Sequence, residues 1–207
     1  LGTEGSHALD GELKNIERLF NEGFRMMSLQ HFFDNKLGGS LHGISGNGLT
    51  QFGQEAIQEM LRLGIMIDVS HSSENVVKDV LNLSDQPILV SHTGFNGHCP
   101  SSRNISDSLM KEIAKKDGLV AVGFWHAAVC NNTPQSVAEA IQYGIELIGA
   151  KHVALGSDFD GAVRPGFDTS ELVAITHELL EAGVKESEIR LVMGENMLNF
   201  LKKNLAD

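Results

Sequence analysis

The chain has 207 residues, 42% of them hydrophobic, and a formal net charge of −11 at pH 7. This length suits one substantial core rather than two, so residues 1–207 are predicted to form a single domain. The acidic balance argues against nucleic acid or an anionic membrane surface as a partner. No apolar run reaches the roughly 18–20 residues that span a bilayer, and the first ten residues lack the pattern of a signal peptide.

The two cysteines, Cys99 and Cys130, are too few for a disulfide scaffold and do not form a C-x-x-C motif. We therefore expect two free thiols in a reducing compartment. Together with the absence of a targeting pattern, this predicts a cytoplasmic protein.

Short apolar runs alternate with amphipathic segments along the chain. The opening residues, with Glu4 in the sequence "LGTEGSH", read as the exit of a first strand. The later runs that read as strands are 25–31, 65–71, 87–92, 119–125 and 152–158. These runs are continuously apolar, as expected of parallel strands that are covered on both faces.

The segments between these runs have helical periodicity. The expected helices are 10–23, 50–64, 73–84, 106–118, 135–149, about 169–182 and 186–204. Thr50 and Ser106 are suitable N-caps, and Gly64 and Gly149 stand where helices would end. Strand and helix alternating at this spacing is typical of an α/β fold with βαβ units.

Four of the five later runs end in a chemically capable side chain: His31, His71, His92 and Asp158. A TIM barrel gathers the carboxyl ends of all its strands around one site, whereas a doubly wound sheet uses mainly its switch point. The pattern therefore favours a TIM (β/α)8-type barrel. Only six strands are counted, so we expect the chain to correspond to strands three to eight of a partial metallohydrolase barrel, without the first two.

His71 and His92 finish consecutive strand-like runs, which would bring their imidazoles close together. Neutral imidazole is a preferred ligand of zinc, and a carboxylate such as Glu4 is its usual companion. One histidine at a strand end is more often a hydrogen-bonded core residue. Two in matching positions, with acidic residues at other strand ends, predict a metal centre.

Five motifs occur together in a familiar order. They are "GTEGSHAL" (2–9), "GLTQFGQEAIQEMLRLGIMIDVSHSS" (48–73), "SH" (91–92) followed by "SSRN" (101–104), "GSDFDG" (156–161) and "GENMLNF" (194–200). This arrangement closely resembles the membrane (renal) dipeptidase family of binuclear zinc peptidases, and the resemblance runs essentially from end to end of the chain.

The resemblance implies a metal site and a reaction. Glu4 would bridge two zinc ions, and His71 and His92 would complete the protein ligands of the second. The implied reaction is hydrolysis of dipeptides by a hydroxide that the two ions share and whose pKa they lower. The family also implies homodimers and tolerance of D-residues at the C-terminal position of the substrate.

The resemblance also implies substrate-binding and catalytic residues. His31 would polarise the substrate, Arg103 would bind the substrate, and Asp158 would exchange protons with the substrate amine and the attacking water. Bidentate pairing of Arg103 with a substrate carboxylate suits a small peptide with a free C-terminus. Each residue also has a structural alternative: a solvated arginine, an aspartate that forms a turn, and a histidine that packs beside Phe32 and Phe33.

The sequence departs from the family at one point. The family places a His-x-Asp pair on its first strand, and this chain has none; "HALD" (7–10) has the wrong spacing. Glu4 alone would be inadequate for the first zinc. We consider a fragment, a second chain that supplies the strands, or a natural truncation, and favour the fragment. The polypeptide expressed as given is then predicted to be insoluble or inactive, because an open barrel exposes strand edges.

Three functions remain in view. A zinc dipeptidase is the leading hypothesis. A catalytically impaired, metal-poor barrel that acts as a binding or scaffold protein would explain the missing His-x-Asp pair. A metal-dependent amidohydrolase acting on other small amides would keep the site and change the substrate.

Overall fold

The structure is a computed structural model that describes residues 1–205. It has an α/β fold whose six strands form a sheet in the order β1-β2-β3-β4-β5-β6. The strands are β1 (Gly2–Thr3), β2 (Met26–Ser28), β3 (Met66–Asp68), β4 (Leu89–Thr93), β5 (Leu119–Val122) and β6 (Val153–Leu155). The α/β class is confirmed. A sheet in chain order has no reversal, unlike a doubly wound sheet, and is the winding expected of a (β/α) barrel.

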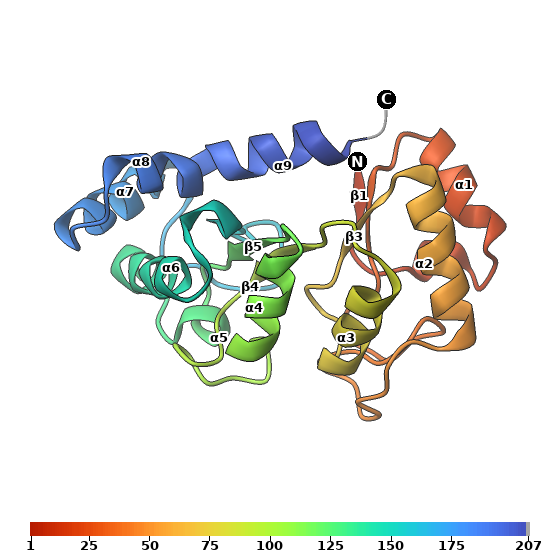
Figure 1. Cartoon of the computed structure of the whole chain (residues 1–207). Helices are drawn as coiled ribbons and strands as arrows, with labels where there is room; N and C mark the ends of the chain where they lie inside the picture. Colours follow the sequence, from red (N-terminus) through yellow and green to blue (C-terminus); the bar gives the residue numbers. More distant parts are fainter. Residues whose placement is uncertain (206–207) are drawn as a thin grey trace. The chain divides into compact units, whose positions relative to one another are not determined.

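The helices alternate with the strands (Figure 1). They are α1 (Lys14–Asn21), α2 (Gln51–Leu63), α3 (Glu74–Leu83), α4 (Asp107–Lys115), α5 (His126–Val129), α6 (Pro134–Ile148), α7 (Leu172–Glu181), α8 (Glu186–Arg190) and α9 (Asn196–Asn204). Short 3-10 helices span His7–Leu9, Ala150–His152 and Thr169–Glu171, and a π-helical turn spans Leu191–Glu195. The helix expected over 186–204 is therefore interrupted, with non-helical backbone angles at Gly194.

Local signals explain where several helices begin and end. The Thr50 side chain accepts a hydrogen bond from the Gly53 amide at 3.0 Å and so caps α2. Gly64 ends that helix with a left-handed φ of 72°, which glycine adopts without steric cost. Ser106 is the N-cap residue of α4, as predicted, although its side chain makes no capping hydrogen bond.

By its internal contacts, the chain divides into two compact units. The first contains residues 1–89 together with the chain from Leu201, and the second contains Val90–Phe200. In the first unit, α1 packs beside α2 (Figure 1), and Met27 and Ile57 are fully buried. In the second unit, α6 packs against α7 and β6. The single domain over residues 1–207 stays a prediction.

Cys99 and Cys130 form a disulfide, so the expectation of two free thiols is wrong. Cys99 lies in the loop after β4 and Cys130 is the C-cap residue of α5. Their Cα atoms are 5.4 Å apart across 31 residues of sequence, within the range that a disulfide requires. The pairing depends on how β4 and α5 fold in the second unit, which cysteine spacing does not encode.

Across residues 1–205, no helix combines the length and the apolar character needed to cross a membrane.

Candidate metal centre

Glu4, His31 and His71 converge at the carboxyl ends of three neighbouring strands in the first unit. β1, β2 and β3 pair in parallel, with Thr3 beside Met27 and Ser28 beside Asp68. Because parallel strands end at the same edge, the residues that follow them are brought together. Glu4 comes directly after β1, and each histidine follows its strand by three residues.

The Glu4 carboxylate contacts both imidazoles. Its Oε1 atom lies 3.0 Å from the Nε2 atom of His71, and its Oε2 atom lies 3.5 Å from the Nε2 atom of His31. The side chain of His71 is 6% exposed, that of His31 is 31% exposed and that of Glu4 is 44% exposed. The cluster therefore has a buried side, at His71, and a side that faces solvent.

The backbone at Gly5 makes room for this arrangement. Gly5 has a φ of 78°, and a Cβ atom placed there would lie 3.2 Å from the Cβ atom of His31. A side chain at this position would be strained by the backbone angle and would press on a residue of the cluster. The glycine after Glu4 thus allows the chain to turn sharply where β1 ends.

The donor set suits a divalent metal ion such as zinc. One ligand atom from each of Glu4, His31 and His71 lies within 4.8 Å of the other two. Two imidazole nitrogens and a carboxylate oxygen are characteristic protein ligands of catalytic zinc. The two histidine rings meet edge to face with centroids 4.8 Å apart, so both nitrogens can approach a single region of space. The residues therefore fit a metal.

Two aromatic neighbours of this cluster gave no signal of function in the sequence. Phe32 lies beside His31, with ring centroids 4.3 Å apart. The ring centroid of His42 lies 5.4 Å from that of His71. His42 is in no strand-like run, and only the folding of the loop that carries it brings it here.

His92 and Arg103 form a second group, in the second unit. His92 belongs to β4, and its Nδ1 atom lies 2.9 Å from the Ser91 hydroxyl. Arg103 is 5% exposed, and its Nη2 atom donates to the main-chain oxygen of His92 at 2.6 Å. The Trp125 ring lies 6.0 Å from His92 and 5.3 Å from the guanidinium carbon. Trp125 is the only tryptophan of the chain and stands at the end of a predicted strand; this combination could have marked it as a site residue.

Asp158 lies in the loop after β6 with a left-handed φ of 58°. A non-glycine residue in this region is uncommon and is best tolerated by aspartate and asparagine. Gly161 packs closely against it, because a Cβ atom there would lie 2.1 Å from the Asp158 Oδ1 atom. The neighbouring Phe159 ring meets Phe124 and Phe167, with centroids 5.6 and 6.4 Å apart, which anchors the loop.

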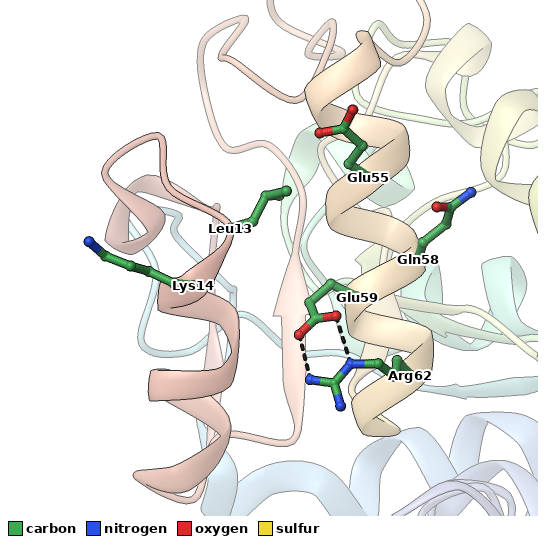
Figure 2. Close-up of a pocket in the computed structure, with 6 residues that line it drawn as sticks. All are labelled: Leu13, Lys14, Glu55, Gln58, Glu59 and Arg62. Atoms are coloured by element: carbon green, nitrogen blue, oxygen red, sulfur yellow. Dashed lines mark hydrogen bonds and ion pairs between the residues drawn. The ribbon is translucent and has the colours of Figure 1, made fainter.

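A surface groove of about 380 Å³ lies between α1 and α2, apart from these residues (Figure 2). Its lining residues are Leu13, Lys14, Glu55, Gln58, Glu59 and Arg62. Figure 2 shows the two hydrogen bonds, of 2.8 and 2.6 Å, between the Arg62 guanidinium and the Glu59 carboxylate. The guanidinium lowers the pKa of Glu59. The ion pair satisfies both charges, and none of the predicted site residues lines the groove.

The model of the membrane dipeptidase family, peptidase family M19, matches residues 1–206. The chain belongs to this family. Membership agrees with the expectation drawn from the five motifs. It gives the convergence of Glu4, His31 and His71 a chemical context, because metallopeptidases of this family depend on metal.

Individual relatives support the assignment. The chain is 34% identical to "Dipeptidase aclJ" of Aspergillus oryzae (strain ATCC 42149 / RIB 40), over 97% of this chain and 50% of that protein. It is 27% identical to a crystal structure of "dipeptidase AC", a family M19 metallopeptidase, with a TM-score of 0.90 over 100% of this chain and 64% of that one. A metallopeptidase from Rhodobacter sphaeroides, liganded with a phosphinate mimic of the dipeptide L-Ala-D-Ala, is 27% identical, with a TM-score of 0.86 over 98% of this chain and 62% of that one. The chain thus spans about half the length of the curated relative that it matches.

Proposed function

We propose that the protein is a zinc-dependent dipeptidase. The observation that carries this proposal is the convergence of Glu4, His31 and His71 at the ends of three parallel strands, in a chain of family M19. The match to the membrane dipeptidase family and the similarity to dipeptidases do not favour the alternative of a metal-poor scaffold.

We propose Glu4, His71 and His92 as zinc ligands. The Glu4 carboxylate lies 3.0 Å from the Nε2 atom of His71, so these two side chains could hold zinc together. His92 is assigned as a zinc ligand through the family resemblance, and the contact of its Nδ1 atom with the Ser91 hydroxyl fixes its ring. When bound, two zinc ions would acidify a water molecule and polarise the scissile carbonyl.

The protein's own residues would bind the dipeptide and move the proton. We assign the substrate carboxylate to Arg103, because a guanidinium that the His92 carbonyl holds in place is preorganised for an anion. Asp158 would take the proton released as water adds to the carbonyl carbon. It would deliver that proton to the amine nitrogen as the C–N bond breaks. His31, which is partly exposed beside Glu4, would donate to the substrate oxygen on which negative charge develops.

The phosphinate mimic of L-Ala-D-Ala bound to the Rhodobacter sphaeroides relative supports a dipeptide as the substrate class. It also supports acceptance of a D-residue at the C-terminal position. The family resemblance implies a homodimer, which is part of the same proposal. Light scattering of the purified protein, which gives its molar mass in solution, tests this. The cytoplasmic location stays a prediction, and the Cys99–Cys130 disulfide weighs against it, because disulfides are rare in reducing compartments.

The test uses the full-length protein and combines metal analysis with hydrolysis of L-Ala-L-Ala and L-Ala-D-Ala. We expect zinc in the purified protein, loss of hydrolysis on chelation and recovery on adding zinc. His92→Ala should lose at least tenfold in zinc affinity. His177→Ala, on the exposed face of α7, is the matched control and should keep both properties. Purified protein with no divalent metal and no activity towards either dipeptide would contradict the proposal.

A further inference from the structure

Residues 34–45 form a loop, here called the strap, that lies along the ends of β2 and β3. Ser40 forms an isolated antiparallel bridge with Ser72, directly after His71. The Leu41 amide donates to the main-chain oxygen of His71 at 2.7 Å. The strap therefore binds the backbone of the segment that carries one of the converging histidines.

Ser40 connects this segment to the other histidine. The residue is 2% exposed, and its hydroxyl oxygen lies 2.8 Å from the main-chain oxygen of His31 and 3.2 Å from that of His71. Its hydroxyl proton can therefore be donated to either carbonyl or shared between them. Because the site is buried, the bond is shielded from water, and removing the hydroxyl would leave two carbonyls without their common donor.

Asp34 gives the strap its shape. Its carboxylate accepts hydrogen bonds from the amides of Ser40 at 2.8 Å, Ile44 at 3.2 Å and Ser45 at 3.0 Å. These amides lower the pKa of Asp34, so the side chain is ionised at neutral pH. Gly43 lies so close that a Cβ atom there would be 1.8 Å from the Asp34 Oδ1 atom. The strap is folded tightly around one negative charge.

Other buried polar contacts join the same strand ends. The Ser72 hydroxyl donates to the Gln30 side-chain oxygen at 2.6 Å. Ser72 follows His71 in the sequence, and Gln30 precedes His31. The Ser6 hydroxyl and the Asn35 amide both donate to the main-chain oxygen of Leu29, at 2.6 and 2.7 Å. The ends of β1, β2 and β3 are therefore linked in pairs. Within this network, Ser40 is the residue that touches the backbones of both histidines.

We propose that Ser40 is a positioning residue that sets the separation of His31 and His71, and that Asp34 holds Ser40 in place through the strap. The inference rests on the proposed function, in which these histidines serve the metal and the substrate. A metal site loses affinity when the groups that orient its ligands are removed, typically by about 10–100-fold. Ser40 acts on the main chain behind the rings, so we place its effect at the low end of that range.

Ser40→Ala tests this role, with Ser136→Ala as the matched control. Ser136 is also buried, but its hydroxyl contacts Thr133 at the start of α6 in the second unit. Zinc affinity is measured by chelator competition, and the ligand geometry by the visible absorption of the Co²⁺-substituted protein. We expect Ser40→Ala to bind zinc about tenfold more weakly and to change the Co²⁺ spectrum. Ser136→Ala should match the wild type in both.

Asp34→Asn is the second variant, for the case in which Ser40→Ala does not fold. It keeps the size of the side chain and loses the charge, so the strap should loosen and the Co²⁺ spectrum should change in the same direction. The inference is overturned if the folded Ser40→Ala protein has the zinc affinity and the Co²⁺ spectrum of the wild type. Where only Asp34→Asn folds, the same result in that variant overturns it. The proposed function stands in either case. A wild-type protein that binds neither Zn²⁺ nor Co²⁺ overturns the proposed function, and this inference with it.

Discussion

The guanidinium of Arg103 is bound to the main chain of His92: its Nη2 atom donates to the His92 oxygen at 2.6 Å. From sequence alone, an arginine on a polar loop is as easily a solvated side chain as a binding residue. The structure shows a residue that is 5% exposed, with its guanidinium carbon 5.3 Å from the centre of the Trp125 ring. A charge held in this way has little freedom to lose when it binds an anion.

Replacing Arg103 should separate binding from chemistry. We expect Arg103→Lys to raise KM for L-Ala-L-Ala about 10–100-fold, with a smaller change in kcat, because an ammonium cannot pair bidentately with a carboxylate. Steady-state kinetics and zinc content check this. Arg62→Lys is the control and should leave KM unchanged, because Arg62 pairs with Glu59 on α2. A normal KM in Arg103→Lys would remove the residue from the proposed site.

Asp158 and Asp160 provide a matched pair in one loop. Asparagine tolerates the left-handed φ of 58° at position 158, so Asp158→Asn should fold normally while losing the carboxylate that we propose moves the proton. We expect kcat to fall about 10²–10⁴-fold, the usual contribution of general acid–base catalysis. Asp160→Asn, at an exposed position, should lose less than twofold. Equal effects at both positions would indicate that the two residues only shape the loop.

The positions of the strands could be predicted because buried parallel strands are continuously apolar. Their lengths could not. The runs at 25–31 and 65–71 were expected to be strands up to their final histidines, whereas β2 ends at Ser28 and β3 at Asp68. One main-chain hydrogen bond to a neighbouring strand persists beyond each end, from the Leu29 amide to Asp68 at 3.2 Å and from the Val69 amide to Leu89 at 3.0 Å. The main-chain oxygens of the two histidines then contact Ser40 of the strap. Apolar periodicity reports burial, and it does not distinguish a strand from the buried segment that follows it.

The same physical difference separates the predicted and unpredicted parts of the site. Glu4, His31 and His71 could be placed together because the ends of neighbouring parallel strands share an edge. Ser40 could not, because it lies in an irregular loop, nine residues after His31 and 31 before His71 in sequence. The Cys99–Cys130 disulfide could not be predicted for the same reason, because it depends on contacts between loops, which carry no periodic signal.

Stability should fall as the pH drops through the range in which His152 titrates in the unfolded chain. Burial lowers the pKa of His152 below 6.5 in the folded protein, although its Nδ1 atom lies 2.9 Å from the Gly118 main-chain oxygen. Between the lowered pKa and 6.5, the unfolded state binds more protons, so the free energy of unfolding rises with pH in this window. Burial also lowers the pKa of His98, so this residue adds to the effect in the same direction.

His152→Asn isolates this contribution, because the asparagine amide can donate to the Gly118 oxygen in place of Nδ1–H. We expect the wild-type Tm to fall more than that of His152→Asn when the pH is lowered from about 7.5 to about 5.5, around the ordinary histidine pKa. His177→Asn, at an exposed position on α7, should behave as the wild type does. An equal fall in Tm for the wild type and His152→Asn would show that another group controls stability in this range.

The disulfide should stabilise the second unit and hold the loop that carries Arg103. Closing a loop of 31 residues removes chain entropy from the unfolded state worth about 3–4 kcal/mol. The side chain of Asn104, next to Arg103, donates to the main-chain oxygens of Cys99 at 2.8 Å and Ala128 at 2.9 Å, so the bond fixes both ends of this contact. The double variant Cys99→Ala/Cys130→Ala should therefore unfold at lower denaturant concentration and show a raised KM.

Adding reductant should lower the stability of the wild type and leave that of the double variant unchanged. Thiol titration of the denatured wild type should give no free thiol before reduction and two per chain after it, since the chain has two cysteines; two thiols before reduction would show that the bond does not form.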